Sequence, residues 1–200
     1  MDPGGPAAGK PPDLPGLPAA CALLVVDVQL GFEDPSFGTR NNPSCEQNVA
    51  RLIAAWRERH QPVVFVRHES RKADSPLAPG SPGNQFKPQL QGEPDLVVTK
   101  HVHSAFYGQP DLDHWLQDGG VEAVAICGIT TDHCCETTAR MASDLGYATT
   151  FVLDATHTFD RVTPTGELIT ADEVARATAA SLHGEFAAVL ATDELLAGIG

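Results

Sequence analysis

Short apolar runs that alternate with helical patterns constrain the fold of this chain more than any other feature. We predict strands at these runs, which cover residues 21–28, 62–67, 95–100, 121–127, 148–154 and 185–191. Several of them are almost continuously apolar, as in CALLVVDV and PVVFVR. Such runs are typical of strands that are buried on both faces of a parallel sheet.

Helical patterns separate most of these runs. We predict helices over residues 44–60, 112–118, 131–145 and 170–182. In the first helix, apolar residues from Val49 to Trp56 recur at helical spacing. Strands that alternate with helices predict an α/β fold with helices on both faces of the sheet. We therefore expect a doubly wound three-layer sandwich whose six-stranded parallel sheet has the order 3-2-1-4-5-6.

Composition sets the domain organisation. A chain of 200 residues with 42% hydrophobic content is large enough for one domain with a full core, which we place at residues 19–200. Residues 1–18 are rich in proline and glycine and lack periodicity, so we expect a disordered tail there. Residues 69–91, rich in proline, glycine and serine, predict a long loop of the kind that is usually functional or mobile.

Charge and cysteine content exclude several classes of partner. The formal net charge of −13 argues against binding to nucleic acid or to an anionic membrane. No apolar run approaches the roughly 20 residues of a membrane helix, and the N-terminal segment does not resemble a signal peptide. The five cysteines lack the spacing of a zinc site, so we expect reduced thiols in a cytoplasmic protein.

Cys134 is the first candidate for chemistry. It follows the predicted strand at 121–127 after a tight turn and lies in the first turn of the next predicted helix. Backbone N–H groups and the helix dipole at such a position stabilise a thiolate, which is the nucleophilic form of cysteine. The alternative is that Cys134 and Cys135 are a buried pair in the core, a common role for free cysteines.

Two more reactive side chains are expected at the same edge of the sheet. Asp27 ends the first predicted strand and Lys100 ends the third. Ligands of open parallel sheets bind beyond the carboxyl ends of the strands, the edge at which these side chains and Cys134 are expected to lie. A carboxylate that accepts the thiol proton and an ammonium that stabilises negative charge suit acyl transfer. Taken singly, Asp27 could instead cap a helix and Lys100 could be a surface charge.

Other classes of function lack their motifs. A dinucleotide-binding protein requires G-x-G-x-x-G after the first strand, where this chain has DVQLGFED. A serine hydrolase requires G-x-S-x-G, which is absent. A thiol redox sensor that uses Cys134 and Cys135, and a catalytically silent binding protein on the same fold, stay open as alternatives.

The motifs together resemble the isochorismatase-like cysteine hydrolases, a family that includes nicotinamidases, N-carbamoyl amidohydrolases, streptothricin hydrolase and isochorismatases. The resemblance extends over residues 22–191. It rests on LLVVDVQLGF, VRHES at 66–70, SPLAPGSPG at 75–83, KHVHSAF at 100–106 and GITTDHCCETTARMASDLGY at 128–147. The last two motifs are the most specific.

The resemblance implies a catalytic triad of Asp27, Lys100 and Cys134. It also implies a cis peptide bond between Ile129 and Thr130, which would direct the N–H of Thr130, with that of Cys134, toward a substrate oxygen. It further implies a homodimer or homotetramer in which a neighbouring subunit sometimes closes the active site.

The expected activity is cysteine-dependent hydrolysis of an amide or related C–N bond, including lactams, in a small molecule. Nicotinamidases of the family carry a metal-binding Asp-x-His, whereas this chain has VRHESRKADSP in the corresponding region. We therefore expect neither a bound metal nor another cofactor. The alternative within the family is hydrolysis of a vinyl ether, as in isochorismatase. The resemblance implies that this reaction does not need the thiol.

Five further residues are candidates for the substrate pocket because of where they fall in the predicted elements. Each follows a strand end or adjoins the nucleophile; they are Phe32, His68, Phe106, His133 and His157. His133 directly precedes Cys134 and is the strongest of the five. For Phe32 and Phe106, a position in the core is the open alternative.

Overall fold

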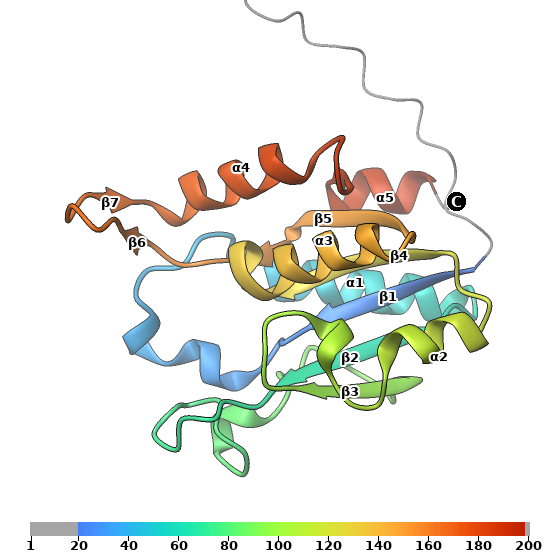
Figure 1. The fold of residues 1–200 in the computed structure, drawn as a ribbon, viewed down its shortest axis with the longest axis horizontal. Coiled ribbons are helices and arrows are strands. Elements are labelled where there is room, and N and C mark those ends of the chain that lie inside the picture. The colour runs from blue at the N-terminus through green and yellow to red at the C-terminus, as the bar shows by residue number, and fades with distance from the viewer. Residues whose placement is uncertain (1–19, 199–200) are drawn as a thin grey trace, which may run out of the picture.

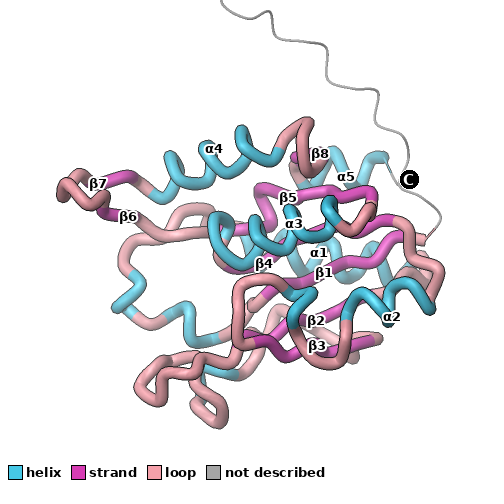
Figure 2. The backbone as a smooth tube through the Cα atoms, viewed as in Figure 1, coloured by secondary structure: helices cyan, strands magenta, loops and turns pink. Residues whose placement is uncertain are grey.

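A six-stranded parallel sheet forms the middle layer of the structure, a computed structural model that describes residues 20–198. The predicted tail at 1–18 and the first residue of the predicted domain lie outside the described residues. The strands of the sheet are β1 (Cys21–Val26), β2 (Val63–His68), β3 (Leu96–Lys100), β4 (Ala123–Ile129), β5 (Ala148–His157) and β8 (Ala188–Leu190). Their order is β3-β2-β1-β4-β5-β8, which confirms the predicted order with β8 as the sixth strand (Figure 1; β8 is labelled in Figure 2).

Helices cover both faces of this sheet, as predicted. They are α1 (Cys45–Glu58), α2 (Leu112–Asp118), α3 (Glu136–Asp144), α4 (Ala171–Leu182) and α5 (Thr192–Gly198). Leu23 of β1 belongs to the core layer shared with α1 and α5, whereas Leu24 belongs to the layer shared with α2, α3 and α4. Successive side chains of a strand point to opposite faces of the sheet, and both faces are covered by helices. Every residue of β1 is therefore buried. This explains the continuous apolar run in the sequence.

Two features in the second half of the chain differ from the prediction. A short antiparallel hairpin, β6 (Arg161–Val162) and β7 (Leu168–Ile169), projects from the body beside α4 (Figure 1). Strand β5 extends to residue 157 rather than 154, and its register against β4 shifts between Ile126 and Gly128. The shift inserts extra residues into β5, so the periodicity of its first half does not predict where its last residues point.

The loop between β2 and β3 contains one short helical turn, η3 (Pro82–Asn84), and no other regular element (Figure 2). Gln29, fully buried just after β1, ties this loop to the sheet. Its Nε2 donates to the carbonyl oxygens of His68 and Asn84, each at 3.0 Å, and its Oε1 accepts from the N–H of His68 at 2.8 Å. The loop is therefore fixed against the carboxyl ends of β1 and β2.

No helix in the described part of the chain is both long and apolar enough to cross a membrane.

Candidate active site

Asp27 lies immediately after β1, at the carboxyl edge of the sheet. Its φ of 53° is in the left-handed region, which few residue types other than glycine adopt. Its N–H donates to the carbonyl oxygen of Val66 on β2, and its own carbonyl oxygen accepts from the N–H of Gln29. The backbone thus leaves the sheet abruptly at Asp27. The side chain is fully buried beyond the strand end.

Lys100 reaches Asp27 from an edge strand. β3 is two strand spacings from β1, about 9–10 Å. Lys100 pairs in register with His68 of β2, and its side chain extends past that strand. Its Nζ lies 2.5 Å from Oδ2 of Asp27, and neither side chain is accessible to solvent. Burial lowers the pKa of Lys100, but the charge of Asp27 and the hydrogen bonds to Asp27 and Cys134 outweigh it, so the pKa is raised and the side chain is an ammonium.

Cys134 completes the cluster from the other side of β1. Its Sγ lies 3.4 Å from Nζ of Lys100. Gly128, near the end of β4, allows β4 to lie close against the end of β1, because a Cβ there would lie 1.9 Å from the carbonyl oxygen of Val26. The peptide bond between Ile129 and Thr130 is cis, at the position implied by the family resemblance. The structure therefore brings Asp27, Lys100 and Cys134 into contact beyond the strand ends.

The local helix and the protonation state of Cys134 differ from the prediction. Residues Thr131–Cys135 form a π-helical turn that precedes α3, rather than the first turn of an α-helix. Burial raises the pKa of the Cys134 thiol, the charge of Asp27 raises it further, and Lys100 only partly opposes them. The helix N-terminus was expected to stabilise a thiolate, whereas burial and the charge of Asp27 favour the neutral thiol at this site.

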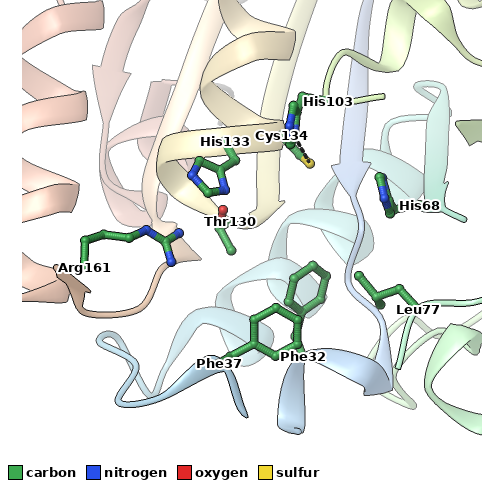
Figure 3. Close-up of a pocket in the computed structure, with 9 residues that line it drawn as sticks. All are labelled: Phe32, Phe37, His68, Leu77, His103, Thr130, His133, Cys134 and Arg161. Atoms are coloured by element: carbon green, nitrogen blue, oxygen red, sulfur yellow. Dashed lines mark hydrogen bonds between the residues drawn. The ribbon is translucent and has the colours of Figure 1, made fainter. Parts of the chain in front are cut away.

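A cavity of about 160 Å³ opens onto the sulfur of Cys134. Figure 3 shows its walls: Phe32, Phe37 and Leu77 on one side, with His68, His103, His133, Thr130 and Arg161 around the rim. The rings of Phe32 and Phe37 are 5.1 Å apart, and Phe37 stacks on Phe159 at 5.2 Å. The cavity is therefore small, with an apolar wall that faces a polar rim.

Three of the predicted pocket residues, Phe32, His68 and His133, line this cavity. Phe106 does not, because the short turn Ala105–Tyr107 directs its ring onto that of Tyr147, 5.9 Å away. His157 does not either. The shifted register of β5 carries it to the side of the sheet covered by α1, where it is fully buried against Phe159 at 5.3 Å.

The sequence interpretation did not assign Phe37, Leu77, His103 and Arg161 to the pocket. Leu77 comes from the long loop after β2, whose composition marked it as functional without indicating which residue would face the site. Arg161 lies on the unpredicted hairpin and donates through Nε to Oδ2 of Asp132 at 3.0 Å. Asp132 thus supports the turn before Cys134.

Asp27, His68 and Cys134 also form the one group of three metal-ligating side chains found in the described residues, with ligand atoms within 4.8 Å of one another. Nζ of Lys100 lies 3.2 Å from Nδ1 of His68 and contacts the other two. Burial and the Lys100 charge lower the pKa of His68, so its ring is neutral and accepts this hydrogen bond. A metal ion would have to displace the ammonium that already supplies the positive charge.

A buried ion network lies behind the aromatic wall. Glu46 accepts hydrogen bonds from Arg40 at 2.7 and 2.9 Å and from Nζ of Lys87 at 2.7 Å. Burial raises the pKa of Glu46, but the hydrogen bonds from Arg40 and Lys87 outweigh it and lower the pKa to about 2. The network joins helix α1 to the loops after β1 and β2, and these two loops carry the wall residues Phe32, Phe37 and Leu77.

We expect Glu46→Gln to lower the free energy of unfolding at neutral pH and to reduce its acid dependence. Because the folded-state pKa lies below the ordinary value of 4.5, ionised Glu46 stabilises the fold above that pH, and this contribution disappears as the pH falls toward 2. Urea denaturation from pH 7 to pH 2 should therefore show that the difference in the free energy of unfolding between wild type and variant decreases toward zero. Glu122→Gln, at an exposed position, is the control. A gap that is constant with pH would contradict the assignment.

Together these features define a class of protein: a hydrolase with a doubly wound α/β domain whose reactive groups lie beyond the strand ends. The chain belongs to the isochorismatase family, since the family model described as the isochorismatase domain matches residues 21–190.

Individual relatives agree with this membership. The chain is 35% identical to YrdC, an uncharacterized isochorismatase family protein of Bacillus subtilis, over 88% of this chain and 94% of that protein. It is 32% identical to Nicotinamidase 3 of Arabidopsis thaliana, over 70% of this chain and 74% of the relative. A crystal structure of an isochorismatase-family protein from Chromobacterium violaceum superposes with a TM-score of 0.88 at 36% identity, covering 94% of this chain and 97% of that one.

Proposed function

We propose that this protein is a cysteine hydrolase that cleaves a C–N bond of a small amide through a thioester intermediate. One observation carries the proposal: a single buried ammonium, that of Lys100, contacts both the carboxylate of Asp27 and the thiol of Cys134. A thiol, a base and a cation in mutual contact are the groups that acyl transfer requires. Nicotinamidase 3, by its name, acts on an amide, which supports the same bond type.

The neutral state of the thiol defines the first step. Asp27 takes the proton of Cys134 as the sulfur attacks the amide carbonyl carbon, so that no free thiolate accumulates. Oδ1 of Asp27 has no hydrogen-bond partner among the described residues and can accept this proton. Lys100 holds the opposite oxygen and stabilises the negative charge that develops nearby.

The second step breaks the C–N bond. Asp27 returns the proton to the leaving nitrogen, the amine departs, and the acyl group stays on Cys134 as a thioester. The backbone N–H groups of Thr130 and Cys134 are the proposed donors to the carbonyl oxygen, a contribution of about 3–4 kcal/mol for one such donor. Water then hydrolyses the thioester and restores the thiol.

The cavity supports a small substrate with an apolar part. Its volume of about 160 Å³ suits a small acyl group. Phe32, Phe37 and Leu77 offer that group an apolar wall opposite the sulfur. A cytoplasmic location and a homodimer or homotetramer stay predictions.

A substrate panel tests the proposal. Small primary amides, N-carbamoyl compounds and lactams are incubated with the enzyme, and released ammonia or amine is measured. Reactions quenched in acid are digested, and the peptide that contains Cys134 is examined by mass spectrometry for the acyl group. We expect amine release with at least one substrate and an acyl adduct on Cys134. Turnover with an adduct on another residue, or with none at Cys134 under any quench condition, would contradict the mechanism.

We predict that Asp27→Asn has opposite effects on hydrolysis and on alkylation. Hydrolysis should fall about 10²- to 10⁴-fold, because the base is lost. The pKa of the Cys134 thiol should fall by about 1–3 units, because the charge of Asp27 raises it and Lys100 would remain as the counter-ion of the thiolate. The rate of iodoacetamide labelling against pH measures this shift.

Asp132→Asn is the matched control for that experiment. Asp132 also borders the site, but it pairs with Arg161 rather than with the thiol. Its variant should leave the midpoint of alkylation near that of the wild type. If Asp27→Asn leaves the midpoint unchanged or raises it, Asp27 does not control the protonation of the thiol.

A further inference from the structure

A second proton acceptor contacts the nucleophile. Nδ1 of His103 lies 3.6 Å from Sγ of Cys134, drawn as the dashed line in Figure 3. His103 lines the same cavity, and its side chain is exposed, unlike those of Asp27 and Lys100. The mechanism proposed above gives this histidine no role.

The two proton acceptors differ in their access to water. Asp27 is fully buried, and one of its two oxygens is held by Lys100. The water that hydrolyses the thioester has to enter through the cavity, by the route that the amine leaves. His103 borders that route, and its Nδ1 is within reach of the sulfur from the cavity side. It is therefore positioned where the second half of the reaction takes place.

We propose that His103 is the general base for hydrolysis of the thioester, an inference that rests on the proposed cysteine hydrolase function. Neutral His103, with its proton on Nε2, accepts a proton from water at Nδ1 as the water oxygen bonds to the carbonyl carbon. The S–C bond then breaks, and Nδ1 gives that proton to the departing sulfur of Cys134. Atoms and charge balance: the acid product leaves, and thiol and imidazole return to their starting forms.

His101 provides a matched control two residues away. It is also exposed and belongs to the same loop after β3, but its Nδ1 lies 2.8 Å from the carbonyl oxygen of Glu69. It does not line the cavity. A change at His101 thus alters a histidine of the same loop without touching the sulfur.

The test separates the two halves of the reaction with p-nitrophenyl acetate. Acylation of Cys134 releases p-nitrophenol in a rapid burst, and the slower phase that follows reports deacylation. For His103→Gln we expect a burst whose rate is within about 3-fold of the wild type, and a second phase slowed about 100-fold. The acetyl group should accumulate on Cys134 by intact mass. His101→Gln should match the wild type in both phases.

A second variant distinguishes proton transfer from packing. In His103→Ala, added imidazole should restore the slow phase, because this site is open to solvent and the free base can replace the missing ring. A slow phase in His103→Gln equal to that of the wild type would overturn the inference, as would equal slowing of burst and slow phase, or a failure of imidazole to restore deacylation. If wild type and Cys134→Ala release p-nitrophenol identically, the proposed function itself fails and the inference falls with it.

Discussion

Cys134→Ala is expected to abolish amide hydrolysis, with kcat/KM lower by at least about 10⁴-fold, because no other group can form the thioester. The fold should survive. The substitution removes one small sulfur atom from a buried turn, for which we expect a loss of about 1 kcal/mol in the free energy of unfolding. Amine release from the best substrate of the panel measures the first effect, and urea denaturation measures the second.

Cys135→Ala is the matched control for this prediction. Cys135 is the neighbouring thiol, fully buried in the core layer that α2, α3 and α4 cover. It is absent from the residues that line the cavity. Its variant should keep hydrolysis within a few-fold of the wild type at a similar cost in stability. Retention of more than about 1% of wild-type activity in Cys134→Ala, once contamination is excluded, would show that the thiol is not the nucleophile.

Lys100→Met should be the most destabilising of the substitutions considered. It leaves the carboxylate of Asp27 in a fully buried position without its 2.5 Å partner. Breaking a buried ion pair from one side lowers the free energy of unfolding by about 3–5 kcal/mol, since the remaining charge is desolvated and uncompensated. Hydrolysis should be lost as well, because the same ammonium contacts the thiol. Urea denaturation at pH 7 measures the first effect.

The double variant Asp27→Asn/Lys100→Met tests the physical cause. Replacing both partners removes the unpaired charge, so much of the lost stability should return even though activity does not. If the double variant is as unstable as Lys100→Met at neutral pH, loss of packing rather than an unpaired carboxylate is the cause.

The sheet could be predicted from sequence because its strands are buried on both faces. Each β1 residue lies in a core layer, so a continuous apolar run is required there and recurs in most of the other strands. The alternation with helices then restricts the topology to a parallel, doubly wound sheet. The same argument placed Asp27, Lys100 and Cys134 at one edge, because all parallel strands end on the same side.

The contact between those three residues did not follow from strand order. β3 is at the edge of the sheet, and Lys100 reaches Asp27 only because its long side chain extends past His68 of β2. The protonation state of Cys134 likewise depended on burial, which its position in a predicted helix did not reveal. In both cases the deciding quantity was a distance or a desolvation that involves residues far apart in the sequence.

The pocket was the least predictable part, and the errors have a common cause. His157 and Phe106 were placed in the pocket because each follows the end of a strand, but the register shift in β5 and the turn at 105–107 send them elsewhere. His103 and Leu77 lie on loops, Phe37 lies on a short helical turn, and Arg161 lies on the two-residue strand β6. These segments are too short or too irregular for a period to relate the sequence position to the direction of the side chain. Local bulges and turns have to be known before such residues can be assigned.

The sequence by itself determined the family, the layer architecture and the identity of the groups at the carboxyl edge of the sheet, because these depend on periodicity and on short motifs. Only the tertiary structure decided which side chains touch. It showed that Lys100 contacts both Asp27 and Cys134, that burial raises the pKa of the thiol, and that His103 contacts the sulfur from the cavity side. Contacts and desolvation arise between segments that only folding brings together, and they govern the chemistry of the site.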